Sequence, residues 1–264
     1  MKKLRLDQLV FEMGLVESRE RAKTTVMSGL VYVNGQKADK PGMSVSPDAK
    51  IEVRGEAIPF VSRGGFKLDK ALKVFPIDPE GLTCIDCGAS TGGFTDVLLQ
   101  HGAKRVYAVD VGYGQLAWKL RTDDRVVCIE RTNVRYLSRE QIPEAPELAV
   151  MDLSFISIKL VLPAVRALLV PGADIVCLIK PQFEAGRDEV GKKGVVRDSA
   201  VHKEVIESIL SFAPTLGLTV MGLDYSPIKG PEGNIEYICH MKNGEYETEK
   251  PDVDAVVAAS HEMQ

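Results

Sequence analysis

Cysteine is sparse in this sequence, and its distribution argues against two common roles. Five cysteines occur in 264 residues, an odd and scattered set that does not resemble a disulfide framework, so we expect a reducing compartment. Cys84 and Cys87 are separated by two residues, but no second pair follows them to complete a zinc site. We therefore expect both thiols to be structural, and we expect no metal site.

Long apolar runs and an export signal are also missing. The longest largely apolar stretch, residues 161–170, is interrupted by Pro163 and Arg166, so no segment is expected to span a membrane. The basic start of the chain is not followed by the apolar region of a signal peptide. These features predict a cytoplasmic protein with no membrane partner, and they leave its oligomeric state open.

The charge of the chain is divided unevenly along its length. Residues 1–73 contain 14 Lys and Arg against 9 Asp and Glu, a net charge of +5. The remaining residues contain 19 against 28, a net charge of −9, so that the whole chain carries −4. A basic segment in front of an acidic body predicts an appended module that binds a polyanion.

The basic segment has the pattern of a small α+β domain. Apolar residues recur at helical spacing from Leu4 to Met13, and Ser18 is placed to cap a second helix that ends before Gly29. Short β-like stretches follow at residues 30–36 and 49–55, with turn residues between them. We expect two helices packed on a small sheet.

The stretches LDQLV, ESRERAKTTVMSGLVYVNG and KPGMSV resemble the small RNA-binding fold named after ribosomal protein S-four. The resemblance covers residues 4–54 and implies that the second helix and the loop after it face RNA phosphates and sugars. Lysine and arginine act there through phosphate charge, so binding should be sensitive to salt. The basic residues expected to contact RNA are Arg5, Arg19, Lys23, Lys37 and Arg63.

A helix at residues 67–75 opens the second domain, after which strands alternate with helices. Strands are expected at residues 82–87, 105–110, 125–129, 148–153, 173–179, 219–225 and 235–241. Helices are expected at residues 93–101, 114–121, 158–169 and 200–216, with a short one near 252–262. This alternation predicts a parallel, doubly wound α/β sheet.

The last two strands depart from that rule. Only residues 226–234, rich in proline and glycine, join them, which is too short for a helical crossover, so they should form an antiparallel hairpin. Six strands in one direction and a reversed seventh resemble the Rossmann-like sheet of S-adenosylmethionine-dependent methyltransferases, in which the reversed strand inserts between the fifth and sixth. The expected parts are an RNA-binding domain (1–58), a linker (59–65), a methyltransferase domain (66–245) and a tail (246–264).

A turn of small residues, DCGASTGGF, follows the first strand of the sheet. Small side chains let the backbone approach a ligand closely, and a helix N-terminus follows. The dehydrogenase and P-loop spacings are absent. Asp110, which ends the second strand, can accept hydrogen bonds from both hydroxyls of a ribose, and Asn133 after the third strand can contact adenine.

The turn and the resemblance of the sheet together predict S-adenosylmethionine as the cofactor. The residues expected to contact it are Asp86, Gly88, Ala89, Ser90, Thr91, Gly92, Gly93, Phe94, Asp110, Val111, Asn133 and Asp152.

Ionisable residues gather at the carboxyl edge of the predicted sheet, where ligands of such sheets bind. Lys180 ends the apolar run ADIVCLI, and a lysine ends a buried strand only where something pairs with it. Asp152 ends the fourth strand, and Glu236 begins the reversed strand, which faces the same edge. Neighbouring strands lie about 4.8 Å apart, so these three side chains should converge.

Lys67, Asp152, Lys180 and Glu236 match the Lys-Asp-Lys-Glu constellation of the FtsJ-type ribose 2′-O-methyltransferases. The stretches SRGGFKLDKAL, DCGASTGGFTDVLL, MDLSFIS and GNIEY, with the basic module in front, are similar to the TlyA-type family. This resemblance spans residues 3–242. It implies catalytic roles for the four residues and 2′-O-methylation of cytidine in ribosomal RNA. Ribosomal RNA within ribosomal subunits is then the expected partner of the basic module.

Attack by a ribose hydroxyl on a sulfonium methyl group requires removal of the hydroxyl proton or stabilisation of the developing alkoxide. Lys180 can do either. The neighbouring cation Lys67 favours its neutral, basic form, whereas the carboxylates of Asp152 and Glu236 favour its charged form. The sequence leaves both roles open, with the carboxylates orienting Lys180 and Lys67 holding the 2′-oxygen or a phosphate.

Other functions fit the sequence less well. Methylation of exocyclic amines usually goes with a proline-containing motif where this chain has DLSF, and no Pro-Cys dipeptide is present for methylation of cytosine carbon. Proteins of this type are often labelled haemolysins, but the sequence has no strongly basic amphipathic helix. A catalytically silent RNA-binding assembly factor is the third alternative, and the four matched residues argue against it.

Overall fold

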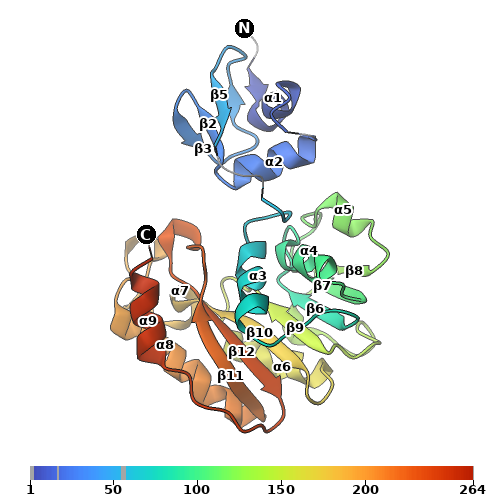
Figure 1. Ribbon diagram of the computed structural model, residues 1–264, viewed down its shortest axis with the longest axis vertical. Helices are drawn as coiled ribbons and strands as arrows, with labels where there is room; N and C mark the ends of the chain where they lie inside the picture. Colours follow the sequence, from blue (N-terminus) through green and yellow to red (C-terminus); the bar gives the residue numbers. More distant parts are fainter. Residues whose placement is uncertain (1–2, 17, 55–57, 264) are drawn as a thin grey trace. The chain divides into compact units, whose positions relative to one another are not determined.

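The computed structural model describes residues 3–16, 18–54 and 58–263 (Figure 1). The chain divides into two compact units, Met1–Arg63 (unit 1) and Gly64–Gln264 (unit 2), and each is described by itself. Residues 1, 2, 17 and 55–57 of the expected RNA-binding domain, and residue 264 of the expected tail, lie outside the described residues.

Unit 1 packs two helices on small antiparallel sheets. The helices are α1 (Leu6–Glu12) and α2 (Arg19–Met27), and the strands are β1 (Leu4–Arg5), β2 (Val31–Val33), β3 (Gln36–Ala38), β4 (Ser44–Val45) and β5 (Ile51–Val53). The strand orders are β3-β2-β5 and β1-β4. Ser18 caps α2 as expected, because its Oγ accepts a hydrogen bond from the N–H of Arg21 at 3.1 Å. Leu6, Val26 and Val31 are buried in a shared core.

Unit 2 is built on a seven-stranded sheet with the order β11-β12-β10-β9-β6-β7-β8. The strands are β6 (Thr83–Cys87), β7 (Arg105–Val109), β8 (Val126–Ile129), β9 (Leu148–Met151), β10 (Asp174–Ile179), β11 (Leu218–Tyr225) and β12 (Tyr237–Asn243). β12 pairs antiparallel with β10 and β11, whereas β10, β9, β6, β7 and β8 pair in parallel. The reversed strand and its insertion between the fifth and sixth strands are therefore confirmed.

Helices pack against this sheet (Figure 1). They are α3 (Gly65–Val74), α4 (Gly93–Gln100), α5 (Trp118–Arg121), α6 (Leu162–Leu168), α7 (Pro181–Glu184), α8 (Ser199–Phe212) and α9 (Val253–His261). The described residues also form the 3-10 turns η1 (Val134–Tyr136), η2 (Ile158–Leu160), η3 (Lys192–Gly194), η4 (Ala213–Leu216) and η5 (Pro231–Gly233). The core on one face joins Ile85 and Ile175 of the sheet with Leu162 of α6 and Ile206 of α8.

Three helices differ from their expected length for local reasons. The helix expected at residues 200–216 ends at Phe212, and η4, which contains Pro214, follows it. The helix expected at residues 114–121 begins only at Trp118, because Gly114 is left-handed with φ +69°. The helix expected at residues 158–169 is divided into η2 and α6. Pro163 lies at the start of α6, where a residue without an N–H is tolerated.

β10 leads directly to the functional edge of the sheet. Its residues from Ile175 to Ile179 are buried, as expected for a strand covered on both faces. Ile179 lies opposite Tyr237 of β12, and Cys177 lies opposite Met151 of β9. Because β12 runs in the reverse direction, its beginning lies beside the ends of β9 and β10.

Candidate active site

Four ionisable side chains from distant segments meet at this edge. Lys67 lies on α3, Asp152 follows β9, Lys180 follows β10 and Glu236 precedes β12. Since β9, β10 and β12 are neighbours, the sheet carries three of these residues to one place, and α3 supplies the fourth. The structure thus brings together the four side chains that the sequence singles out.

Each ammonium group contacts both carboxylates. Lys67 Nζ lies 2.6 Å from Glu236 Oε2 and 3.2 Å from Asp152 Oδ2. Lys180 Nζ lies 2.5 Å from Asp152 Oδ1 and 3.9 Å from Glu236 Oε1. The two cations and two anions alternate in a closed ring, which we call the tetrad.

The tetrad is largely withdrawn from solvent. The side chains of Glu236, Lys180 and Lys67 are 0%, 7% and 8% exposed, whereas that of Asp152 is 20% exposed. Burial alone would lower the pKa of Lys67, but Asp152 and Glu236 outweigh it and raise this pKa. Burial would raise the pKa of Asp152, but Lys67 and Lys180 outweigh it and lower this pKa. Lys67 is therefore held as an ammonium ion and Asp152 as a carboxylate.

A residue of α7 and one of the connection between β11 and β12 enclose the tetrad near Glu236. Gln182 Nε2 donates a hydrogen bond to Glu236 Oε1 at 3.4 Å. A β-carbon built at Gly230, between β11 and β12, would lie 2.3 Å from the same oxygen. A side chain at position 230 would therefore displace Glu236 from its contact with Lys67.

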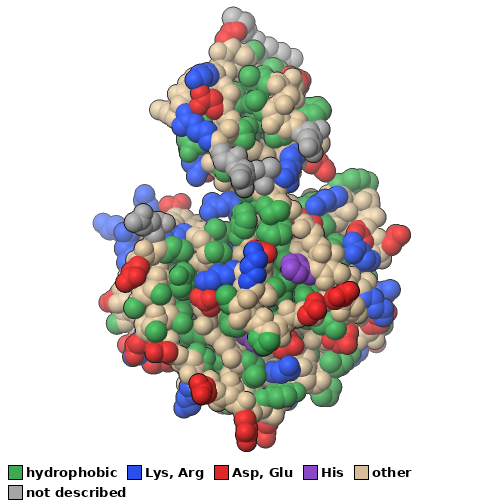
Figure 2. All heavy atoms as spheres, viewed as in Figure 1, with side chains coloured by type: hydrophobic (Ala, Val, Ile, Leu, Met, Phe, Trp, Pro, Cys, Tyr) green, Lys and Arg blue, Asp and Glu red, His purple; other side chains and the backbone are tan. Residues whose placement is uncertain are grey.

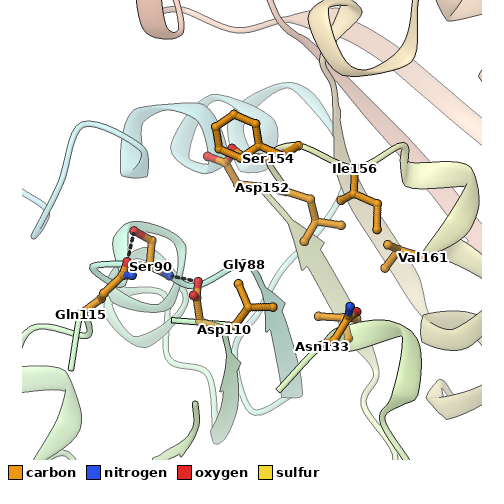
Figure 3. Close-up of a pocket in the computed structure, with 13 residues that line it drawn as sticks. Gly88, Ser90, Asp110, Gln115, Asn133, Asp152, Ser154, Ile156 and Val161 are labelled. Carbon is orange, nitrogen blue, oxygen red and sulfur yellow. Dashed lines mark hydrogen bonds between the residues drawn. The ribbon is translucent and has the colours of Figure 1, made fainter. Parts of the chain in front are cut away.

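A cavity of about 500 Å³ shares a wall with the tetrad (Figure 3). The residues that line it are Gly88, Ser90, Asp110, Val111, Gln115, Asn133, Val134, Asp152, Leu153, Ser154, Phe155, Ile156 and Val161. Asp152 belongs to both the cavity and the tetrad. Ser154 also connects them, because its Oγ accepts a hydrogen bond from Lys180 Nζ at 3.3 Å. A molecule in the cavity therefore lies next to the ring of charges.

Backbone donors hold the Asp110 carboxylate at the wall of the cavity (Figure 3). The N–H of Ser90 donates to its Oδ2 at 2.8 Å, and the N–H of Gly112 donates to its Oδ1 at 2.6 Å. Each oxygen has a further lone pair with which to accept a hydrogen bond from a ligand. Gly88 has φ +85°, and a β-carbon there would lie 2.7 Å from the carbonyl oxygen of Asp152. Only glycine permits this close approach.

The structure places half of the expected cofactor contacts on the cavity and half elsewhere. Gly88, Ser90, Asp110, Val111, Asn133 and Asp152 line it, whereas Asp86, Ala89, Thr91, Gly92, Gly93 and Phe94 do not. A β-carbon at Gly92 would lie 2.2 Å from Leu120 Cδ1, so this glycine allows α5 to pack on the turn. Phe94 is part of the buried core. The second half of the turn therefore serves packing.

Asp86 is fully buried beneath the glycine turn. Its Oδ2 accepts hydrogen bonds from the N–H and Oγ1 of Thr95 at 2.9 and 2.7 Å, which tie the end of β6 to α4. Its Oδ1 has no hydrogen-bonding partner among the described residues. Burial raises the pKa of Asp86 to about 7, although the hydrogen bonds from Thr95 oppose this shift.

Phe155 is a feature of the site that sequence analysis missed. Its side chain lines the cavity and is 90% exposed, and its backbone has φ +64°, which bulky residues rarely adopt. Its ring contacts that of Phe183, with the centroids 5.1 Å apart. The only signal in the sequence is its position in MDLSFIS, close after Asp152. Gln115, Val134, Leu153, Ser154, Ile156 and Val161 were also missed.

The basic residues expected to contact RNA are accessible in unit 1. Arg19, Lys23, Lys37 and Arg63 are exposed. Arg5 is half exposed and pairs with the buried Asp7, with Nη2 lying 2.8 Å from Oδ2. Figure 2 shows Lys and Arg side chains on one face of this unit, with acidic side chains among them. Arg5 therefore already has a partner within α1, whose first turn it helps to hold.

The cysteines have the structural character expected of them. Cys84 and Cys87 are both buried, and burial raises the pKa of the Cys84 thiol to about 12. Within the described ranges, no group of three or more His, Cys, Asp and Glu side chains could hold a metal ion. A search of the same ranges finds no helix with the length and apolar character needed to cross a membrane.

Comparison with known proteins finds two family matches in the chain. The FtsJ-like methyltransferase family matches residues 60–243, and the S4 domain matches residues 4–51. A candidate rRNA methyltransferase of Bacillus subtilis, YqxC, is 54% identical over 241 residues, which are 91% of this chain and 86% of that protein.

Two further relatives match nearly the whole chain. The 16S/23S rRNA (cytidine-2′-O)-methyltransferase TlyA of Mycobacterium tuberculosis is 45% identical over 242 residues, which are 91% of this chain and 90% of that protein. A solved structure of a candidate hemolysin from Streptococcus thermophilus is 48% identical, with a TM-score of 0.79, and the match covers 100% of this chain and 97% of that one.

Proposed function

Because this chain belongs to the FtsJ-like methyltransferase family and begins with an S4 domain, we propose that it methylates the 2′-oxygen of a ribose in ribosomal RNA. S-adenosylmethionine is the proposed methyl donor. Cytidine is the proposed target, as the name of the Mycobacterium tuberculosis relative states for that protein. Ribosomal RNA within ribosomal subunits is the proposed substrate, so the protein is proposed to act in the cytoplasm.

One observation carries this proposal: a ring of two ammonium groups and two carboxylates shares Asp152 with the wall of a cavity. A surface salt bridge needs neither burial nor a neighbouring cavity. Here three of the four side chains are at most 8% exposed, and each of the four comes from a different segment of the chain. Burying four charges costs free energy. A buried cluster of this kind beside a cavity therefore indicates a functional site.

The cavity fits the proposed donor. The Asp110 carboxylate can accept hydrogen bonds from the hydroxyls of its ribose, and Gly88 lets the backbone approach it. Asn133 Oδ1 already accepts from the N–H of Arg135 at 3.0 Å, which leaves its Nδ2 to donate to an adenine nitrogen. Val134 and Ile156 supply apolar walls for a flat base. When bound, S-adenosylmethionine supplies an electrophilic methyl group on a sulfonium ion.

The contacts favour different roles for the two lysines. Lys180 hydrogen-bonds Asp152 and Ser154, both of which line the cavity, so its ammonium group is placed to orient the 2′-oxygen and stabilise its developing negative charge. Lys67 is held between Asp152 and the buried Glu236. It serves to keep both carboxylates in position around Lys180, rather than to hold the 2′-oxygen.

The S4 domain supplies the proposed docking surface for RNA. The exposed cations of Arg19, Lys23 and Lys37 contact phosphates, with Arg63 and the exposed part of Arg5 as further contacts. Each phosphate contact releases counterions, so the affinity should fall steeply as salt is raised. Substituting Arg19, Lys23 and Lys37 together with alanine should flatten this dependence while leaving affinity for the cofactor product unchanged.

Methyl transfer from tritiated S-adenosylmethionine to purified ribosomal subunits tests the function. Nuclease digestion and mass spectrometry should then identify a 2′-O-methylated nucleoside. Lys180→Ala should abolish transfer and leave the affinity for S-adenosylhomocysteine within a few-fold. Lys203→Ala is the matched control, because Lys203 pairs with Asp254 at 2.6 Å and belongs to neither the tetrad nor the cavity. Methyl groups found only on bases, or full turnover by Lys180→Ala, would contradict the proposal.

A further inference from the structure

Two segments that carry residues of the tetrad also contact each other outside the tetrad. One is residues 152–158, from Asp152 to the start of η2, and the other is residues 180–184, from Lys180 to the end of α7. Lys180 binds Asp152 and Ser154. Further along, the rings of Phe155 and Phe183 contact each other with their centroids 5.1 Å apart.

Glu184 makes the last of these connections. Its Oε2 accepts a hydrogen bond from Ser157 Oγ at 2.6 Å, and its Oε1 accepts one from the N–H of Ile158 at 2.7 Å. Burial raises the pKa of Glu184, although both hydrogen bonds and the charge of Lys159 oppose this shift. The carboxyl group of Glu184 thus accepts two hydrogen bonds from the facing segment in a partly buried place.

The segment after β9 is therefore held at both ends. Asp152 is fixed by the two lysines of the tetrad, and Ser157 and Ile158 are fixed by Glu184. Between these anchors lies Phe155 with φ +64°. A bulky residue is strained in this region, and it persists only where its surroundings enforce it.

We propose that Glu184 is a positioning residue for the methyl-transfer reaction: it clamps the segment after β9 to α7 and so keeps Ser154 and Phe155 beside Lys180. This inference rests on the function proposed above. Glu184 lies four residues beyond Lys180 and binds neither the tetrad nor the cavity. Its effect on the reaction passes through the position of the segment that it holds.

Loss of the clamp should affect turnover more than cofactor binding. Without an acceptor, the N–H of Ile158 and the hydroxyl of Ser157 turn to water, and Phe155 can leave its left-handed conformation. A displacement of about 1 Å at a reacting group can reduce the rate about 100-fold. The cofactor contacts at Gly88, Asp110 and Asn133 lie on other loops and should persist.

Four variants of the full chain test the clamp. In Glu184→Ala, kcat on ribosomal subunits should fall by about 10- to 100-fold, while the affinity for S-adenosylhomocysteine stays within about threefold. Glu184→Gln should restore most of the activity, because its amide oxygen can accept from Ile158 and its amide group can donate to Ser157. Glu189→Ala is the matched control, since this exposed carboxylate accepts from the N–H of Gly186 at 2.8 Å in the adjoining loop.

The fourth variant, Ser157→Ala, removes one hydrogen bond of the clamp and keeps the other. It also removes the hydrogen bond that Ser157 Oγ accepts from the N–H of Lys159 at 3.2 Å. It should lower kcat less than Glu184→Ala does, and the double variant should lose less than the two single losses combined. Wild-type kcat in Glu184→Ala would overturn the proposal. Equal losses in Glu189→Ala, or additive losses in the double variant, would overturn it as well.

Hydrogen exchange, followed by mass spectrometry, tests the clamp without any RNA. The amide of Ile158 should lose protection about tenfold or more in Glu184→Ala and keep it in Glu184→Gln and Glu189→Ala. Unchanged exchange in Glu184→Ala would refute the clamp itself. Should the wild-type protein transfer no methyl group to ribosomal RNA, the proposed function fails, and the exchange result alone decides whether Glu184 holds the segment.

Discussion

Replacing Lys67 with methionine should leave Glu236 buried without its closest cation. The Glu236 side chain is 0% exposed, and the next cation, Lys180, lies 3.9 Å away and already contacts Asp152 at 2.5 Å. At an effective dielectric constant of about 20, unit charges attract by about 6 kcal/mol at 2.6 Å and about 4 kcal/mol at 3.9 Å. The stronger of the two attractions is therefore lost.

We expect Lys67→Met to reduce the free energy of unfolding of unit 2 by about 3 kcal/mol, because breaking a buried pair from one side typically costs about 3–5 kcal/mol and Lys180 provides partial compensation. The double variant Lys67→Met/Glu236→Gln removes both charges. It should return to within about 1 kcal/mol of the wild-type stability. Neither variant should transfer methyl groups. The double variant should therefore regain stability without regaining activity.

Unfolding in urea measures the change in the free energy of unfolding. Circular dichroism and the fluorescence of Trp118 monitor the transition; Trp118 is the only tryptophan of the chain and lies in unit 2. Lys70→Met is the matched control on the same helix. Lys70 pairs with Asp224 at 2.8 Å, where both side chains are 22% exposed, and donates to the carbonyl oxygen of Tyr225 at 2.7 Å, so its loss should cost about 1–2 kcal/mol, less than that of Lys67. The reasoning fails if Lys67→Met is as stable as Lys70→Met, or if Glu236→Gln does not restore it.

Three further predictions concern the cavity and its surroundings. The pKa of Asp86, raised from 3.8 to about 7, implies stability that is present below about pH 4 and lost as the pH rises through 7, by about 4 kcal/mol in total. Asp86→Asn should remove this dependence, and parallel urea-unfolding profiles of both proteins from pH 4 to 8 would disprove it. Asp110→Ala should weaken binding of S-adenosylhomocysteine by about 10- to 100-fold in calorimetric titration, since hydrogen bonds to a charged group are lost; an unchanged affinity would exclude the ribose contact. Phe155→Ala should lower RNA affinity in filter binding by about 1–3 kcal/mol if its exposed ring stacks on a base, and an effect on the cofactor product alone would refute that role.

The strand pattern and the reversed strand could be predicted from the sequence because both depend on local features. Seven short apolar runs mark the strands, and the short connection at residues 226–234 leaves only a hairpin between the last two. Adjacent positions in the sheet then follow from the resemblance to a known fold. This is why Asp152, Lys180 and Glu236 could be expected to meet before their distances were known.

The lining of the cavity could be predicted only in part, because a glycine serves equally well for ligand contact and for packing. Gly88 and Gly92 occur in one turn, yet the first approaches Asp152 and the second makes room for Leu120. Nothing in the turn itself distinguishes them. The difference depends on α5, whose position is set by residues more than 20 places further along the chain.

Contacts between the segment after β9 and α7 could not be predicted from sequence patterns. The exposure of Phe155 follows from its left-handed backbone, and the role of Glu184 follows from hydrogen bonds to residues 26 and 27 positions earlier. Propensity and periodicity describe helices and strands. They do not describe how two irregular segments bind each other, although such segments carry much of the chemistry.

The reversed strand has a consequence for the order in which a newly made chain becomes competent. The residues that line the cavity lie between positions 88 and 161, so they emerge from the ribosome well before Glu236. Glu236, which pairs with Lys67, is 169 positions downstream of it. A chain that stops before Glu236 can contain every wall of the cavity and still lack one of the two carboxylates that pair with its lysines. Chemistry therefore begins only after the final strand has inserted between β10 and β11, both of which are already made.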